Sequence, residues 1–153
     1  MESRSEATMD GNTELLNYIY QGSLMGTETI RHLLNIVSEE EFAKVLKSQY
    51  KEYEEINKEA MNLLHKEGKE EKDIGKTQEV MSSIMIELKT WKDKSSCHIA
   101  EMMMQGSLMG IIEAIKKKNR YKGEDQDIIN LMDRLLKFEE NNMNELKKFL
   151  KEE

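Results

Sequence analysis

The side chains of this chain that are best placed for chemistry lie on apolar stripes and not on its charged surface. With a helical period, Gln49, Tyr53 and Asn57 share the apolar arc of one segment. Glu139 and Asn142 share the apolar arc of another. Two interpretations stay open. The five residues form either a buried polar network that fixes how the helices pack or a divergent site for a metal or another ligand.

Glu139 is the most demanding member of this set, because a buried and unpaired carboxylate is costly. Its neighbours within one helical turn are apolar: Met132, Leu135, Leu136 and Met143. We therefore expect either a raised pKa or a polar partner for Glu139. The candidates for that partner are Tyr50, Tyr53 and Arg134.

Other reactive residue types predict no catalytic set. His32, His65 and His98 fall on outer faces or at a helix end, where surface histidines are common. Cys97 is next to His98, but consecutive helical residues point about 100° apart. The methionines at 102–104 point in three directions, which favours core packing over a soft-metal site.

Apolar residues spaced three and four apart predict an all-α fold built from four helices. We expect a single domain over residues 1–153, in which two related antiparallel hairpins are joined by a long connection. Its parts are a first repeat at about 12–67, a crossover at about 68–94 and a second repeat at about 95–151. Residues 77–94 form either a separate crossover helix or the start of the third main helix.

Residues typical of helix ends mark where these helices begin and stop. We expect Asn12 or Thr13 to cap the first helix, and Ser38 to open a capping box with Glu41. The second helix should end at Gly68 in a left-handed conformation. Asp125 should cap the last helix.

The six-residue string Gln-Gly-Ser-Leu-Met-Gly occurs twice, at 21–26 and 105–110. Small residues four positions apart allow two helix backbones to approach closely. We therefore predict that the first and third helices cross at Gly22, Ser23, Gly26, Gly106, Ser107 and Gly110. The alternative is that the missing side chains leave room for a ligand between the helices.

Leu24 and Leu108 lie on the side opposite the glycines in the two copies. An exposed leucine at both positions indicates a covering element, either residues 81–91 or a second subunit. A homodimer is the simplest partner prediction.

Composition supports the helical fold and excludes some partners. Proline is absent, charged residues make up 35% of the chain, aromatic residues 6%, and the net charge is −7. Without a basic stripe or an apolar run of roughly 20 residues, we expect neither nucleic-acid binding nor a membrane span. A single cysteine and a polar N-terminus without a signal peptide predict a cytoplasmic protein.

Duplicated helical hairpins with a long crossover resemble the ferritin-like superfamily of four-helix bundles. The string QGSLMG, preceded in its second copy by HIAEMMM, is similar to a bacterial branch of small acidic members with an internal duplication. Metal-binding members would have Glu-x-x-His on the second and fourth helices. Here Glu54 with Asn57 and Glu139 with Asn142 keep the spacing but have asparagine in place of histidine. The resemblance therefore implies the fold and a degenerate metal site.

Three functions follow from these patterns. The leading hypothesis is a non-catalytic bundle without a cofactor, which acts as a homodimeric scaffold or partner-binding module. The second is a divergent metalloprotein with redox activity that binds iron or manganese through Glu54, Glu113, Glu139 and His98. The third is a bundle that binds a small molecule in a pocket beside the glycines.

Overall fold

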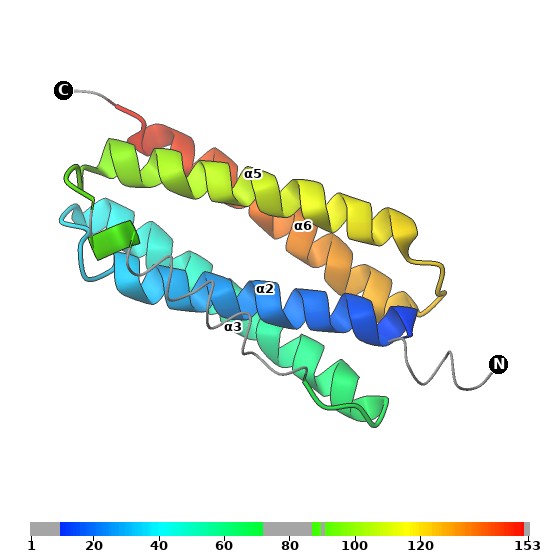
Figure 1. The fold of residues 1–153 in the computed structure, drawn as a ribbon. Coiled ribbons are helices and arrows are strands. Elements are labelled where there is room, and N and C mark those ends of the chain that lie inside the picture. The colour runs from blue at the N-terminus through cyan, green and yellow to red at the C-terminus, as the bar shows by residue number, and fades with distance from the viewer. Residues whose placement is uncertain (1–9, 72–86, 90, 152–153) are drawn as a thin grey trace.

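A computed structural model describes residues 10–71, 87–89 and 91–151, and this part of the chain is all-α (Figure 1). Its long helices are α2 (Gly11–Leu33), α3 (Glu40–Lys66), α5 (Ser96–Arg120) and α6 (Gln126–Leu146). A short 3₁₀ helix, Lys147–Phe149, follows α6. The helices pack as two hairpins, α2 with α3 and α5 with α6, which confirms the predicted all-α class and pairing.

Two of the predicted helix ends are confirmed. Gly68 has a φ of 73° just after α3, where a residue with a side chain would be strained. Asp125 caps α6, because its Oδ1 accepts hydrogen bonds from the backbone N–H groups of Asp127 and Ile128. Glycine after a helix and aspartate before one therefore predicted these ends correctly.

The other two predicted caps are wrong. Helix α2 begins at Gly11, so Asn12 and Thr13 lie inside it and Asp10 is the cap. Asp10 Oδ1 accepts from the backbone N–H of Thr13 at 2.8 Å. For α3 the cap is Glu39, which makes no side-chain capping bond, so the expected capping box at Ser38 does not form.

The third main helix is separate from the crossover. Ser95 caps α5 and accepts a hydrogen bond from the backbone N–H of His98 at 3.2 Å. Residues 91–95 are not helical, although residues 87–89 are. An unbroken helix through 77–94 into α5 is therefore wrong. The rest of the predicted crossover, 72–86, lies outside the described residues.

The buried apolar residues of the described chain form two clusters, one toward each end of the bundle. One cluster, which draws on all four long helices, includes Leu16, Ile19, Ile56, Leu64, Ala114 and Met132. The other includes Ile30, Leu33, Phe42, Leu46, Ile99, Leu146 and Phe149. Each of the four long helices contributes residues to both clusters. Four of the buried polar residues, Ser23, Thr27, Gln49 and Asn142, lie along their helices between the two clusters.

Capping makes the first prediction. Asp10→Ala should lower the free energy of unfolding by about 1 kcal/mol, because the Thr13 amide loses its partner. Ser38→Ala should change it by less than about 0.5 kcal/mol, because Ser38 is exposed and α3 is capped elsewhere. Urea unfolding followed by circular dichroism measures both values. A larger loss for Ser38→Ala than for Asp10→Ala would contradict the observed helix ends.

Candidate functional site

A hydrogen bond between Tyr53 and Glu139 joins the two hairpins at the middle of the bundle. Tyr53 Oη, on α3, donates to Glu139 Oε1, on α6, at 2.5 Å. The Ser107 side chain of α5 lies close enough to the same carboxylate to favour its charged form. The Tyr53 ring packs edge-on against Phe138, with ring centroids 4.7 Å apart. Three helices therefore converge on one carboxylate.

Burial dominates the electrostatics of this pair. It raises the pKa of Glu139 above 4.5, although the hydrogen bond from Tyr53 and the nearby Ser107 side chain favour the carboxylate. Burial and the nearby Glu139 charge raise the pKa of Tyr53 well above 10. Tyr53 is therefore a neutral donor at physiological pH. Glu139 thus has both of the properties expected from the sequence, a raised pKa and a tyrosine partner.

Gly26 makes room for the Tyr53 ring. A Cβ atom at position 26 would lie 2.6 Å from Cε1 of that ring, well inside contact distance. The absence of a side chain at Gly26 therefore accommodates a side chain of α3, within the first hairpin. It does not bring α2 against the backbone of α5.

The predicted crossing of α2 and α5 at the glycines is wrong. A Cβ atom at Gly22, Gly106 or Gly110 would meet nothing within 4 Å. The two helices are instead bridged by a tyrosine, since Tyr18 Oη donates to the carbonyl of Gly110 at 3.2 Å. Burial, with smaller effects of Glu113 and Glu139, raises the pKa of Tyr18 to about 12. The backbones of α2 and α5 are therefore not in close contact at Gly22, Gly106 or Gly110.

Ser23 and Asn57 form a hydrogen-bonded polar pair inside the first hairpin. The Ser23 hydroxyl donates to the carbonyl of Ile19 at 2.7 Å, and the side chain is completely buried. Asn57 Nδ2 donates to Ser23 Oγ at 3.1 Å and to the carbonyl of Tyr20 at 3.0 Å. This part of the predicted polar network therefore ties α3 to α2.

Gln49 and Asn142 are the unusual members of the predicted network. Each is 2% exposed, and the amide nitrogens and oxygens of both lack regular hydrogen-bond partners within the described chain. The Asn142 amide lies close enough to Tyr53 to favour its ionised form, but the contact is not a hydrogen bond of regular geometry. Buried amides without partners cost about 1–3 kcal/mol each. They lie beside an open groove between α3 and α6.

The four residues proposed as metal ligands are not brought together. Glu54 and Glu113 are exposed, on α3 and α5. His98 packs edge-on against Trp91, with ring centroids 4.8 Å apart, whereas Glu139 bonds to tyrosine in the bundle centre. Within residues 10–71, 87–89 and 91–151, no three His, Cys, Asp or Glu side chains are grouped to hold a metal ion.

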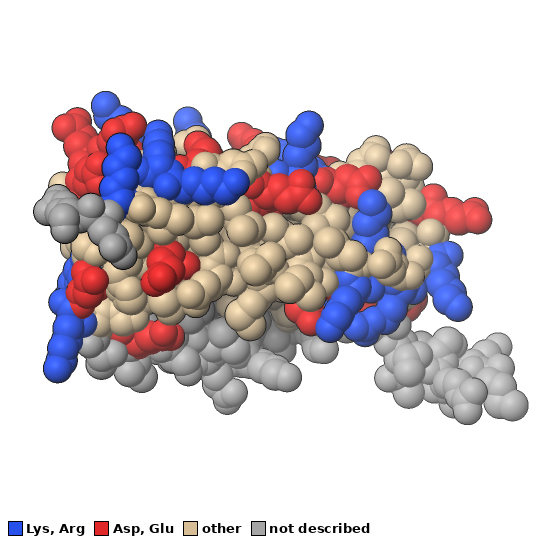
Figure 2. All heavy atoms as spheres, turned by 90° about the horizontal axis from the view of Figure 1, so that it is seen from above, with Lys and Arg blue, Asp and Glu red and all other residues tan. Residues whose placement is uncertain are grey.

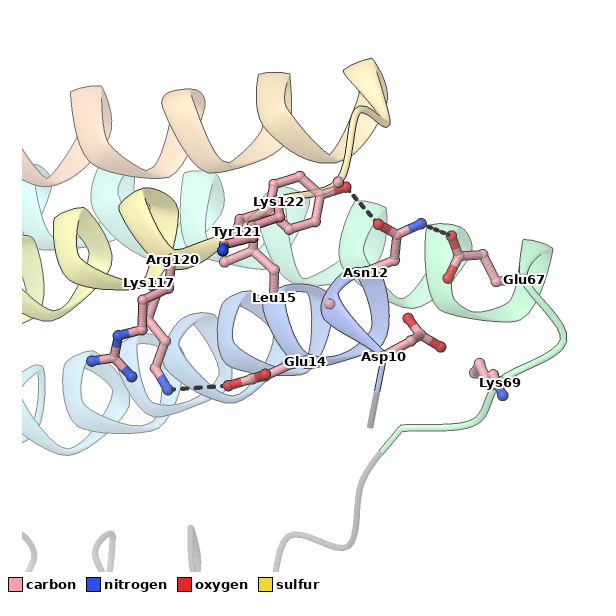
Figure 3. Close-up of a pocket in the computed structure, with 12 residues that line it drawn as sticks. Asp10, Asn12, Glu14, Leu15, Glu67, Lys69, Lys117, Arg120, Tyr121 and Lys122 are labelled. Atoms are coloured by element: carbon pink, nitrogen blue, oxygen red, sulfur yellow. Dashed lines mark hydrogen bonds and ion pairs between the residues drawn. The ribbon is translucent and has the colours of Figure 1, made fainter. Parts of the chain in front are cut away.

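A second concavity, which the sequence patterns did not predict, lies at one end of the bundle (Figure 3). It has a volume of about 690 Å³ and is bordered by the start of α2, the end of α3 and the turn after α5. Tyr121 Oη donates to Asn12 Oδ1 at 2.5 Å, and Asn12 Nδ2 donates to Glu67 Oε1 at 2.9 Å (Figure 3). Basic and acidic residues both line it: Lys69, Lys117, Arg120 and Lys122 with Asp10, Glu14 and Glu67. In the sequence, this concavity is marked only by the basic residues at the end of α5, which are Lys116, Lys117, Lys118 and Arg120.

Comparison of the chain with models of protein families, with curated proteins and with solved structures finds no match. The structure therefore supports the all-α bundle of two hairpins, and no comparison supports the finer resemblance to the ferritin-like superfamily. None of the helices in the described part of the chain is both long and apolar enough to span a bilayer.

The position of Gly26 leads to a prediction with an internal control. Gly26→Ala should lower the free energy of unfolding by about 1–3 kcal/mol, because the new methyl group displaces the Tyr53 ring. Gly22→Ala should raise it by up to about 1 kcal/mol, because alanine favours the helix and meets nothing. Urea unfolding of both variants decides the matter. Equal effects of the same sign would show that Gly26 does not accommodate Tyr53.

The raised pKa of Glu139 predicts a dependence of stability on pH. The folded protein retains this proton at pH values where the unfolded chain, with a pKa near 4.5, has released it. Wild-type stability should therefore fall, relative to Glu139→Gln, as the pH rises from about 4.5 through the folded-state pKa, and the difference should then stay constant.

Unfolding free energies of the two proteins between about pH 4 and about pH 8 test this sign. Glu54→Gln, at the exposed counterpart of Glu139, controls for the loss of one formal charge. A wild-type advantage that grows with pH would mean that Glu139 is stabilised as a carboxylate.

Proposed function

We propose that this protein is a non-catalytic helical scaffold that works as a homodimer, joined through the outer face of α5. The observation that carries the proposal is an apolar stretch on that helix. Leu108, Met109, Ile112 and Ile115 are 49%, 69%, 47% and 43% exposed. Contiguous exposed apolar side chains of this kind mark interaction surfaces in soluble proteins.

The spacing of these residues supports a helix as the partner. At about 100° per residue, Leu108, Met109 and Ile112 centre on the side of α5 opposite its buried residues, and Ile115 flanks them. The buried side of α5 comprises Ile99, Ala100, Ile111 and Ala114. Figure 2, which views the molecule from above α5 in Figure 1, shows a band of uncharged surface between acidic and basic side chains.

The charges at the two ends of this face favour a second copy of the chain as the partner. Glu101 and Lys116 lie on the same side of α5 as the apolar residues, one near each end, and both are exposed. In an antiparallel pair of α5 helices with a twofold axis between positions 108 and 109, Glu101 would face Lys116 of the second copy. The twofold axis repeats this contact, so two opposite-charge pairs would flank one apolar centre.

The other predicted surface leucine is less exposed. Leu24, the counterpart of Leu108 in the first repeat, is only partly exposed. The proposed dimer therefore uses the second copy of the repeated string and not the first. We also propose a ferritin-like ancestry, which the arrangement of the four long helices as two hairpins supports.

Charge exchange tests the dimer most sharply. Wild-type protein should sediment with twice the mass of one chain at micromolar concentration. Glu101→Lys or Lys116→Glu alone should raise the dissociation constant about tenfold, because each puts two like-charged pairs in the interface. The double variant should restore wild-type affinity. A monomeric wild type, or a double variant weaker than either single one, would refute the antiparallel arrangement.

The apolar centre needs a separate variant. Met109→Glu should abolish the dimer without changing helicity, because it places a charge on each side of the axis. Asn144→Glu, at an exposed position of α6, introduces the same charge as a control and should leave the dimer intact. Sedimentation velocity with circular dichroism measures both properties, and a dimeric Met109→Glu would exclude α5 as the interface.

A further inference from the structure

The groove between α3 and α6 combines polar groups that the packing of the bundle does not use. Its volume is about 330 Å³, and its lining includes Gln49 and Asn142 with Glu145 and the Phe138 ring. Concave sites with a few converging polar groups beside an apolar surface are typical of small-ligand binding.

The two amides are the main indication of a ligand. Gln49 and Asn142 both border this groove, are almost completely buried, and have amide donors and acceptors without regular partners in the described chain. The internal duplication supplies a comparison, since Asn142 corresponds to Asn57 at a spacing of 85 residues. The Asn57 amide nitrogen donates hydrogen bonds to Ser23 and to the Tyr20 carbonyl, within its own hairpin. The same residue type therefore has bonded amide N–H groups in one repeat and an amide without regular partners beside a groove in the other.

The charge of the groove selects a cation. Glu52, Glu55 and Glu145 line it, against a single lysine, Lys51. Glu52 and Glu55 both pair with Arg134. Glu145 has no ion pair within the described residues and is exposed at the rim. An acceptor of full negative charge therefore remains beside the two buried amides.

We propose that this groove binds a small primary amine that also carries an oxygen acceptor. The ammonium group would donate to the amide oxygens of Gln49 and Asn142 and to the Glu145 carboxylate. The oxygen of the ligand would accept from the amide nitrogens, and its methylene groups would pack on Phe138. A bare metal cation satisfies only oxygens, so the unused amide N–H groups favour an organic ligand.

Titration with 2-aminoethanol, followed by nuclear magnetic resonance of the side-chain amide groups, tests the proposal directly. The Gln49 and Asn142 NH₂ signals should shift saturably, with a dissociation constant of about 1 mM, as suits so few ligand atoms. Ethylene glycol, which lacks the ammonium group, and tetramethylammonium, which lacks N–H donors, should shift them far less. Equal shifts with ethylene glycol, or no saturable shift with 2-aminoethanol, would overturn the proposal.

Matched variants separate ligand binding from structural roles. Asn142→Leu should abolish the shift of the Gln49 signal and leave the melting temperature unchanged or higher, because an amide without a regular partner is removed. Asn57→Leu should lower the melting temperature but keep binding. Glu145→Gln, at the rim, should weaken binding at least about fivefold at constant melting temperature. Undiminished binding by either Asn142→Leu or Glu145→Gln would overturn the assignment.

Discussion

The hydrogen bond from Tyr53 to Glu139 is the interaction on which the arrangement of the two hairpins depends. It joins α3 to α6 across the boundary between the hairpins, at 2.5 Å, and the Ser107 side chain of α5 lies close to the same carboxylate. On the other side, Gly26 of α2 is in contact with the Tyr53 ring. All four long helices therefore meet at one tyrosine and its acceptor. Because hydrogen bonds require defined distances and directions, this contact sets the relative position of the hairpins in a way that apolar packing alone does not.

The polar residues around Tyr53 and Glu139 separate the two apolar clusters. They lower the free energy of unfolding, but they also fix how the hairpins align. Burial of the Glu139 carboxylate opposes folding, as its raised pKa records. The benefit is a single register, because sliding one hairpin along the other would leave the carboxylate without donors. The duplicated halves have diverged here. Asn57 completes the first hairpin, whereas Asn142 is left beside the groove between α3 and α6.

Much of the fold was predictable because apolar periodicity reports directly which face of a helix is buried. The same reasoning placed Glu139 in the core, since apolar residues surround it in sequence, and it included Tyr53 among three candidate partners. The caps at Asp10 and Glu39 were missed because several adjacent residues can cap a helix and only the folded backbone selects one.

The glycines show the limit of sequence reasoning most clearly. Their pattern is identical in the two repeats, but only Gly26 faces a bulky ring, while a Cβ atom at Gly106 or Gly110 would meet nothing within 4 Å. A glycine permits close approach without specifying what approaches, and here it is a side chain from the same hairpin. The separation of Glu54, Glu113 and His98 was equally invisible, since ligand spacing along one helix does not determine which residues face each other across helices.

A double-mutant cycle between Tyr53→Phe and Glu139→Leu, measured by urea unfolding near pH 7, tests the central contact most directly. If the pair holds the hairpins together, the two substitutions will be non-additive, with a coupling free energy of about 1–3 kcal/mol. A coupling free energy indistinguishable from zero would contradict this account, because the tyrosine and the carboxylate would then contribute independently to the packing of the bundle.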